Sequence, residues 1–417
     1  MISVPSSVLL KSFRKSFQSC LIGAGLVVTF PAFAADEPSP VVLQTHLHPP
    51  YQVMRDHYLS GEVPKTLNCI FKWLDRPYVI NLAPRKRSRQ LIKANRIDGF
   101  FLSTPDEALD ETSLPTEPLA LERWKYYRLK GSDLPAVPNG DQRVGAVLGS
   151  NEAVWLKQHY IPHIQRIPDM ESLVKVLQSQ RLSYVLVDER AFEEAAAKYH
   201  LPNKVLESHF VRYVPLVAYF SKVFIKENPG FLDAFNASLD SCVTGIRDIK
   251  QEEKDYVLKV SNAFVQQHGA RILAEMKEAA FANLSMEKRH DEDKRWTQAM
   301  LNNQTTGLMG LISMTSLSQT LTEQTAKEYG MTEIFVMDRN GFILGMNKPT
   351  SDFWQGDEVA FDQVLKQGKD HYVSKIEFDH STRRFQIQVT LPLMNAASKE
   401  PVGAITIGFD ADRAFQS

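Results

Sequence analysis

The stretch that decides the fold of this chain is Val144–Leu156, VGAVLGSNEAVWL. It begins with a short apolar run, which predicts a buried strand. Gly149 permits a tight turn after that strand. Ser150 or Asn151 is a suitable N-cap for a following helix, and Glu152 places an acidic group in its first turn. Such a unit directs free backbone N–H groups to a sheet edge, where they can hold an anionic or polar group, although an ordinary βα unit without a ligand fits equally well.

Strands and helices alternate on both sides of this stretch. Apolar runs predict strands at 41–46, 78–81, 99–102 and 184–187, and periodic segments predict helices at 66–74, 87–94, 172–177 and 229–242. This alternation is typical of a mainly parallel sheet with helices on both faces. Ligands of such sheets lie outside the carboxyl ends of the strands. The candidate ligand-binding residues at that level are Tyr51, Ser103, Thr104, Ser150 and Asn151.

Five motifs follow one another in the first half of the chain. They are HPPYQ at 48–52, Arg87 with RIDGFF at 96–101, VGAVLGSN at 144–151, RLSYVLVDE at 181–189 and VPLVAYFSKVFIKENPGFLDAFNASL at 214–239. With them this half resembles the type 2 periplasmic solute-binding proteins, in the amino-acid-binding branch called family 3. The resemblance implies two α/β lobes that close on a small ligand, with hinge crossings near Leu119–Leu121 and Val211–Leu216.

The segment after the third strand departs from that family. Amino-acid binders carry an Arg there that clamps the ligand carboxylate, whereas STPDEAL at 103–109 contains no Arg or Lys. The amine-binding Asp of the family has a match in Asp188. The resemblance therefore implies a cationic ligand, a modified amino acid or a polyamine, or no small ligand at all. Arg87 and Asp188 are therefore also candidate ligand-binding residues of the cleft. The alternatives are that Asp188 is a plain helix N-cap and that Arg87 lies on a solvated helix face.

The N-terminus predicts export. A basic segment from Lys11 to Lys15 precedes a short apolar run at 20–30, and Ala32–Ala34 forms an A-x-A site, so we expect cleavage before Ala35 and a periplasmic protein. No later segment approaches the length needed to cross a membrane. Export permits a disulfide between Cys69 and Cys242, and two buried thiols are the alternative.

Composition and motifs narrow the function classes. The 417 residues carry 48 basic and 49 acidic side chains, a net charge of −1, which argues against a general nucleic-acid binder. No G-x-S-x-G, H-E-x-x-H or zinc-type cysteine spacing occurs. We therefore expect no cofactor, no metal and no enzyme activity.

The end of the chain predicts a second, smaller sheet. Asn-Gly at 340–341 is a hairpin turn between two apolar runs. With TEIFVMDRNGFILG at 332–345, TSDFWQGDE at 350–358 and PLMNAASKEPVGAITIGFD at 392–410, this part resembles a Cache domain, a PAS-like sensory fold. The resemblance implies a pocket near Asp352, Trp354 and Asp357, for which a packed Trp and helix-capping acids are the alternative.

These observations predict four segments. They are a signal peptide at 1–34, a two-lobed solute-binding domain at 35–248, a helical connector at 249–295 with a loop or helix break at 283–293, and a Cache-like domain with its leading helix at 296–417. The predicted function is binding of a small ligand and communication with a membrane partner, such as an ABC transporter or a receptor. The alternatives are a ligand-free scaffold and, from another class, a solute-binding-fold enzyme such as a dehydratase.

Overall fold

The computed structural model describes residues 39–243, 248–276, 281, 284–379 and 384–416. The predicted signal peptide lies outside the described residues, so its cleavage before Ala35 stays a prediction. None of the described helices combines the length and the apolar composition that a bilayer crossing requires.

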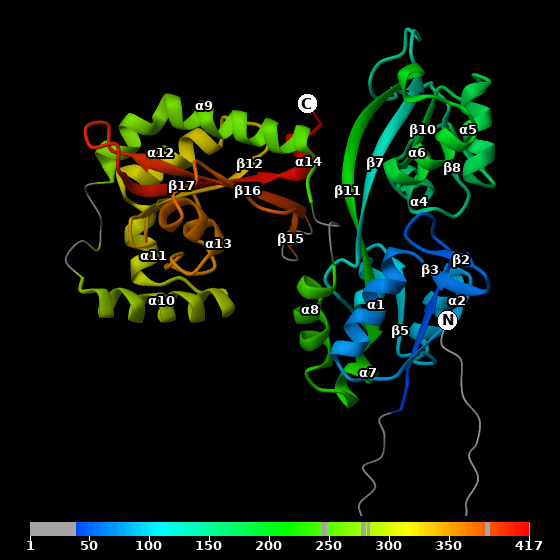
Figure 1. Cartoon of the computed structure of the whole chain (residues 1–417), viewed down its shortest axis with the longest axis horizontal. Helices are drawn as coiled ribbons and strands as arrows, with labels where there is room; N and C mark the ends of the chain where they lie inside the picture. The colour runs from blue at the N-terminus through cyan, green and yellow to red at the C-terminus, as the bar shows by residue number, and fades with distance from the viewer. Residues whose placement is uncertain (1–38, 244–247, 277–280, 282–283, 380–383, 417) are drawn as a thin grey trace, which may run out of the picture. The chain divides into compact units, whose positions relative to one another are not determined.

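The first half of the described chain is built on a nine-stranded mixed sheet (Figure 1). Its order is β4 (Tyr78–Leu82), β1 (Val41–Thr45), β5 (Gly99–Ser103), β11 (Leu206–Ser221), β7 (Ala120–Leu129), β10 (Tyr184–Asp188), β8 (Val144–Val147) and β9 (Ile164–Ile167), with β6 (Ser113–Pro115) paired to β11. A separate hairpin joins β2 (Val53–Arg55) to β3 (Tyr58–Ser60). The predicted mainly parallel core is confirmed for β4, β1 and β5 and for β10, β8 and β9.

Two long antiparallel strands divide this sheet into two lobes. The first half of β11 pairs with β7, whereas its second half pairs with β5 and β6. Strands β1, β4, β5 and β6 form lobe 1, and β7 to β10 form lobe 2. Each lobe has its own apolar core. The chain passes between them where Leu121 pairs with Pro215 and Ala120 pairs with Leu216, at the crossings expected from sequence.

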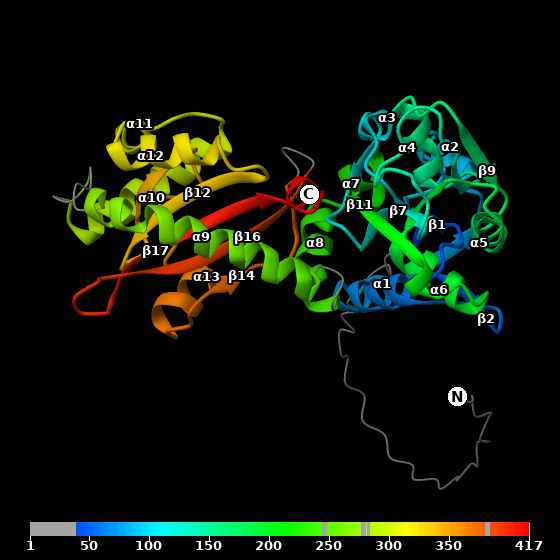
Figure 2. The same ribbon diagram turned by 90° about the horizontal axis from the view of Figure 1, so that it is seen from above.

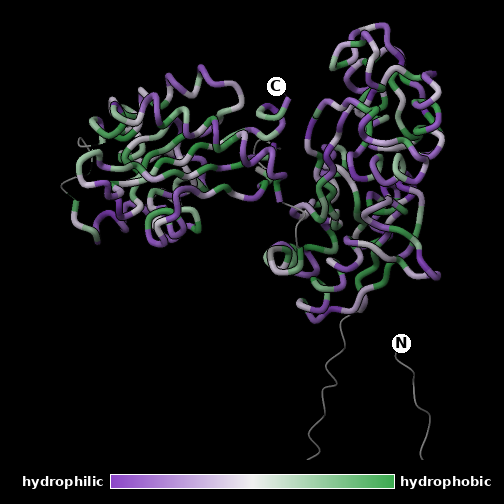
Figure 3. The backbone as a smooth tube through the Cα atoms, turned by 45° about the horizontal axis from the view of Figure 1, so that its top comes forward, coloured by the Kyte–Doolittle hydropathy of each residue, from purple (hydrophilic) through white to green (hydrophobic). Residues whose placement is uncertain are grey.

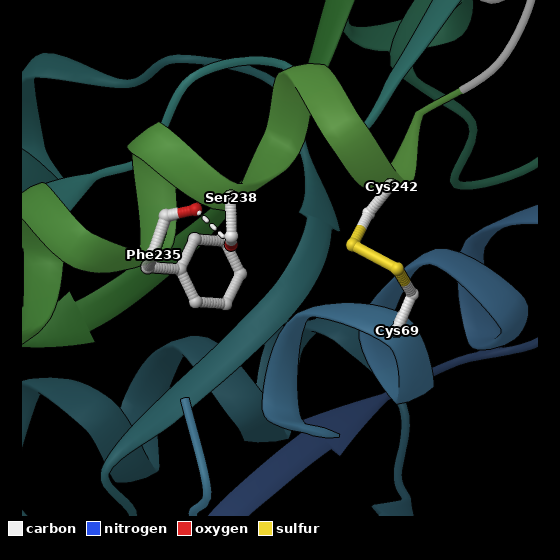
Figure 4. Close-up of a disulfide and its surroundings, with 4 residues drawn as sticks. All are labelled: Cys69, Phe235, Ser238 and Cys242. Atoms are coloured by element: carbon white, nitrogen blue, oxygen red, sulfur yellow. Dashed lines mark hydrogen bonds between the residues drawn. A yellow bond between two sulfur atoms is a disulfide. The ribbon is translucent and has the colours of Figure 1, made fainter. Parts of the chain in front are cut away.

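Helices cover both lobes. They are α1 (Glu62–Trp73), α2 (Arg85–Lys93), α3 (Glu107–Asp110), α7 (Lys222–Glu227) and α8 (Phe231–Cys242) in lobe 1, and α4 (Asn151–Gln158), α5 (Met170–Gln178), α6 (Glu189–Lys198) and the short 3₁₀ turn η1 (Asn203–Val205) in lobe 2. Of the two states left open for the cysteines, the structure has the disulfide. Cys69 on α1 is bonded to Cys242 on α8, with 5.6 Å between their Cα atoms (Figure 4).

The second half contains an antiparallel sheet. Its strands are β13 (Ile343–Met346), β12 (Met331–Asp338), β17 (Pro401–Asp410), β16 (Arg384–Met394) and β14 (Tyr372–Val373), with β15 (Glu377–Asp379) also paired to β16. The Asn-Gly turn sits between β12 and β13, where the Asp338 carboxylate accepts hydrogen bonds from the backbone N–H groups of Asn340 and Phe342. Whether this sheet is a Cache domain stays a prediction.

Helices pack on both faces of the second sheet. They are α9 (Gln251–Glu275), α10 (Met286–Leu301), α11 (Gly307–Ser313), α12 (Ser316–Thr325), α13 (Val359–Phe361), the π-helix η2 (Asp362–Lys366) and α14 (Ala411–Ala414). Figures 1 and 2 both show α9 running lengthwise along the sheet, and Figure 1 draws α13 on the other face. Apolar side chains of α9, such as Val257 and Phe264, belong to the same core as β16 and β17.

The loop or break predicted at 283–293 is wrong for most of its length, because α10 begins at Met286. Ser285 caps this helix by accepting a hydrogen bond from the Lys288 N–H. The polar side chains of α10 hold the neighbouring loop, since the Asp293 carboxylate accepts from the backbone N–H groups of Phe353 and Trp354 at 2.9 and 2.8 Å. Figure 3 shows hydrophobic and hydrophilic stretches alternating along the tube in both halves of the chain.

Candidate functional site

A cavity of about 390 Å³ lies at the junction of the two lobes. The end of β5, the turn after β8, the middle parts of β7 and β11, and helices α2 and α4 meet there, so residues far apart in sequence share one surface. From the two lobes it is lined by Arg85, Arg89, Ser103, Thr104, Pro105, Asp106, Trp124, Gly149, Asn151, Val154, Trp155, Gln158, Arg212, Val214 and Pro215.

Helix α2 turns two of its arginines toward this cavity. Arg85 and Arg89 are spaced at one helical turn, on the same stripe as the buried Ser88 and Ile92. Arg87 lies off this stripe and is exposed. The basic segment is therefore amphipathic, with its inward face at the lobe junction.

Arg85 joins the two lobes. Its guanidinium donates one hydrogen bond to Oδ1 of Asn151 in lobe 2 and another, at 2.9 Å, to Nε2 of His46 in lobe 1. Burial, followed by the charges of Arg85 and His48, lowers the pKa of His46 to about 3, so the ring is neutral. Since a guanidinium cannot accept, His46 Nε2 must be the acceptor and its proton resides on Nδ1.

The strand–turn–helix at 144–156 forms part of the lobe 2 wall of the cavity. Gly149 has a φ of +79°, which a residue with a side chain rarely adopts, so the turn requires glycine. Ser150 caps α4 by accepting a hydrogen bond from the Ala153 N–H at 3.2 Å. Asn151, 8% exposed, places its side-chain amide in the first turn of α4, beside the cavity.

A buried histidine–carboxylate pair makes a second bridge between the lobes. His48 Nε2, after β1, lies 2.6 Å from Oε1 of Glu122 on β7, and Trp124 Nε1 donates to the other oxygen at 2.9 Å. Burial alone would lower the pKa of His48, but the hydrogen bond and charge of Glu122 outweigh it and raise that pKa. Burial alone would raise the pKa of Glu122, but His48 outweighs it and lowers that pKa. The pair is therefore ionic.

The third bridge joins Tyr51 to Asp188. The Tyr51 hydroxyl shares its one proton between two acceptors, Oδ1 of Asp188 at 3.2 Å and the Leu121 carbonyl at 3.1 Å. Asp188 also caps α6, because its carboxylate accepts from the Ala191 N–H, and it accepts a further hydrogen bond from the Arg123 N–H of β7. Burial, followed by the charge of Glu122, raises the pKa of Asp188 to about 7. The Asp188 carboxyl is thus buried and hydrogen-bonded to Tyr51, Arg123 and Ala191.

The sequence-predicted residues divide into three groups. Ser103, Thr104 and Asn151 line the cavity. Tyr51, Ser150 and Asp188 lie at the lobe junction but serve as a bridge or as helix caps. The last group is Arg87, which is exposed outside the lining. A role of any of them in ligand binding stays a prediction.

Most of the lining residues were not predicted, and four of them shape the site. They are Arg85, Arg89, Trp124 and Trp155. For the two arginines a signal existed, because the spacing of Arg85, Ser88, Arg89 and Ile92 marks one helix face. For the tryptophans, an apolar side chain near a turn reads as core, and no pattern in the sequence separates a cavity wall from a core position.

A second cavity, of about 260 Å³, lies over the second sheet. Its wall comes from β12, β16 and β17 together with the segment around α13, and it includes Ser351, Gln355, Glu358, Tyr372 and Glu377. Burial raises the pKa of Glu358, with Asp352 and then Asp357 and Glu377 adding to the effect.

The predicted residues Asp352, Trp354 and Asp357 are not among the lining residues of this cavity. Their neighbours in the sequence, Ser351, Gln355 and Glu358, do line it. Trp354 Nε1 donates to the Asn340 carbonyl at 2.8 Å. One carboxylate oxygen each of Asp352, Asp357 and Glu358 lies within 4.8 Å of the others. Burial is the main cause that raises the pKa of Asp352. Ligand contact by the three predicted residues stays a prediction.

Comparison with known proteins gives structural likenesses alone. No family model matches the chain, and no curated protein matches it. A histidine kinase sensor domain with similarity to periplasmic binding proteins is 13% identical, with a TM-score of 0.42, over 49% of this chain and 91% of that domain.

Two other solved structures are similar to about half of the chain. The GluR0 ligand-binding core from Nostoc punctiforme, in complex with glutamate, is 16% identical with a TM-score of 0.40, over 48% of this chain and 92% of its own. The arginine-, lysine-, histidine-binding protein ArtJ from Geobacillus stearothermophilus is 15% identical with a TM-score of 0.39, over 49% of this chain and 89% of its own. At these identities and scores the likenesses decide nothing about what this chain binds.

Proposed function

We propose that this chain is a periplasmic binding or sensory protein that takes a small ligand between its two lobes. The observation that supports this most is the cavity of about 390 Å³ where the ends of strands from both lobes meet. Polar groups and two tryptophans converge on it, which is the usual composition of a small-molecule site.

Closure of the lobes is the proposed signal. Arg85–Asn151, His48–Glu122 and Tyr51–Asp188 each join a residue of lobe 1 to a residue of lobe 2. A ligand that contacts both lobes adds affinity for this closed arrangement and shifts the population toward it. The crossings on β7 and β11 are the positions where an opening movement would be absorbed.

The proposal extends to a membrane partner that reads the closed state, either a transporter of the ABC class or a receptor. It also includes the domain division at 35–248, 249–295 and 296–417, the Cache-like nature of the last part, and export with cleavage before Ala35. The disulfide between Cys69 and Cys242 supports export, because such bonds persist in oxidising compartments.

A thermal-unfolding screen of the purified chain against amino acids, polyamines, carboxylates and nucleobases tests the ligand part of the proposal. A ligand at a hundred times its dissociation constant stabilises the folded state by about 2.7 kcal/mol, which gives a clear rise in melting temperature. The rise should disappear when Asn151 is replaced by Leu. A screen without any stabilising compound would contradict ligand binding.

One observation favours a second function, that of a ligand-free scaffold. The chain's own side chains bridge the two lobes at Arg85–Asn151, His48–Glu122 and Tyr51–Asp188, and nearer the surface Arg190 pairs with Glu62 at 2.8 Å. The closed arrangement therefore has polar contacts without a ligand. Small-angle scattering separates the two functions. A scaffold keeps one radius of gyration with every compound of the screen, whereas a receptor becomes more compact with its ligand.

A further inference from the structure

Three buried hydrogen-bond donors without a partner belong to residues that line the cavity between the lobes. They are Nε of Arg85, Nδ2 of Asn151 and Nε1 of Trp155, and none of them has an acceptor among the described residues. The orientation of the Asn151 amide is set, because Arg85 donates to its Oδ1. A buried donor without an acceptor is destabilising. The three together therefore indicate a ligand that supplies acceptor atoms.

The net charge of the cavity lining is positive, which also favours a ligand with acceptor atoms. Its charged residues from the two lobes are three arginines and one aspartate, a formal charge of 3 − 1 = +2. Arg89 is paired with the aspartate, Asp106, at 2.5 Å. Arg85 has no carboxylate within 4.0 Å among the described residues, and its two hydrogen-bond partners, Asn151 and the neutral ring of His46, carry no charge. A buried guanidinium in this state is best satisfied by an anion.

The lining offers little to an ammonium group. Asp106 is the one carboxylate among the described lining residues, and its oxygens already accept from Arg89 and from the Ala108 N–H. Asp188 lies outside the lining, with its carboxylate engaged by Tyr51 and two backbone N–H groups. The sequence-based expectation of a cationic ligand depended on Asp188, and this engagement favours a structural role for that carboxylate instead.

The remaining wall is aromatic. Trp124 and Trp155 meet edge to face, with ring centroids 6.1 Å apart and an angle of 78° between their planes. Ring faces and edges of this kind pack against flat or branched apolar groups. The wall therefore suits a ligand with one anionic end and one apolar end.

We propose that the cavity between the lobes binds a small organic carboxylate that has no α-ammonium group, an inference that rests on the proposed ligand-binding function. The carboxylate accepts hydrogen bonds from Arg85 Nε and Asn151 Nδ2, and the apolar body lies against Trp124 and Trp155. The anion is thus held by the first turn of α2, in the same lobe as the Ser103–Asp106 segment that lacks an arginine.

Matched pairs of probes test the ligand class by isothermal titration calorimetry on the full chain. Phenylpyruvate is compared with L-phenylalanine, 4-methyl-2-oxopentanoate with L-leucine, and indole-3-acetate with its neutral amide. We expect at least one carboxylate to bind, and its partner to bind at least about 10-fold more weakly, since the lining favours charge of one sign. Equal or tighter binding of the amino acid would overturn the carboxylate proposal and leave the proposed function standing.

Variants on one helix test the site. Arg85→Gln removes the guanidinium and should weaken the bound carboxylate by about 10- to 100-fold, the range for a charged hydrogen-bond donor. Arg87→Gln is the matched control on the exposed face, and affinity should stay within about 2-fold. If Arg85→Gln fails to fold, Asn151→Asp replaces it, because the carboxylate keeps the acceptor for Arg85 and turns the Nδ2 donor into a repelling oxygen.

The outcomes distinguish the carboxylate site from the more general proposal that the chain binds a ligand. Carboxylate binding that survives both Arg85→Gln and Asn151→Asp places the ligand elsewhere and overturns the site. Binding of spermidine or amino acids without any carboxylate overturns the ligand class and retains a receptor. Absence of binding by every probe, these included, overturns the carboxylate site and the proposed ligand-binding function together.

Discussion

The two cavities of this chain differ in the charge and in the support of their walls. The cavity between the lobes is lined by Arg85, Arg89 and Arg212 against a single Asp106, whereas the charged residues that line the second cavity are Glu358 and Glu377. The first lies where strands of two lobes end. The second lies over one continuous antiparallel sheet.

This difference predicts how each cavity responds to a change in pH or in sequence. Polar bridges between the lobes hold the walls of the first cavity, so its geometry depends on ionisation and on the relative position of the two lobes. The second is backed by Phe335, Met337 and Phe361, all at most 4% exposed, in one apolar core. We therefore expect a change in the ionisation of these groups, or loss of the Cys69–Cys242 disulfide, to affect the first cavity and to leave the second largely unaffected.

The largest expected effect comes from the disulfide, which is in the first half. Its cysteines are 173 residues apart, and a loop of that order contributes about 5 kcal/mol to the free energy of unfolding in the chain-entropy description. Replacing Cys69 and Cys242 by Ala should therefore speed hydrogen exchange in α1 and α8. Exchange in β16 and β17 is the internal control and should stay unchanged. If hydrogen exchange became equally faster in both halves, the two halves would not differ in their dependence on the disulfide.

The next effect is that of the His48–Glu122 pair. Glu122 is 1% exposed, so His48→Ala leaves a buried carboxylate without its cationic partner and should cost about 3–5 kcal/mol in urea unfolding. The double variant His48→Ala with Glu122→Gln removes the charge as well. It should recover much of the lost stability, because a neutral amide needs no counter-charge. A single variant as stable as the parent would show that the pair does not hold the lobes.

The pH dependence of stability follows from the same junction. The pKa of Asp188 is raised from 3.8 to about 7, so its contribution is present at low pH and is lost as pH rises through that interval. The raised pKa of His48 acts in the same direction, its contribution being present below 6.5 and lost above its folded pKa. The lowered pKa of Glu122 acts oppositely, and its contribution is lost as pH falls below 4.5.

The lowered pKa of His46 also acts oppositely to that of Asp188, because its contribution is lost as pH falls below 6.5. The effect of Asp188 is therefore the difference between the parent chain and Asp188→Asn, which does not titrate at this position. Urea unfolding of both proteins at four pH values measures it. The stability of the parent minus that of the variant should fall from about pH 5 to pH 7, by up to about 1.4 kcal/mol per pH unit. A difference that rises through this interval would contradict the direction assigned to Asp188.

The local parts of the fold were predictable because their causes are local. The turn at Gly149 and the cap at Ser150 lie within a few residues of the strand they follow, and the structure has both. Helix α10 was missed because its side chains are polar and charged. What holds it is tertiary, namely the bonds of Asp293 to a loop 60 residues away and the burial of Trp296.

The candidate site was predictable to the level of a sheet edge and no further. Arg85 and Arg87 are alike in sequence, and the phase of α2 relative to β4 decides which of them faces the cavity. For Asp188 the ambiguity concerns the role of one residue, since an acid after a strand is equally suited to cap a helix or to bind an amine. Only the positions of Arg123, Ala191 and Tyr51 around it favour the cap.

The smallest expected effect separates capping from binding at Ser150. Ser150 and Thr315 are both N-caps whose hydroxyl oxygen accepts a backbone N–H at 3.2 Å, one in each half of the chain. Replacing either by Ala should cost about 1 kcal/mol in urea unfolding. If Ser150 only caps α4, carboxylate affinity in Ser150→Ala should match that in Thr315→Ala. A loss of affinity confined to Ser150→Ala would return this hydroxyl to the ligand site and show that the N-terminus of α4 contributes to binding beyond Asn151.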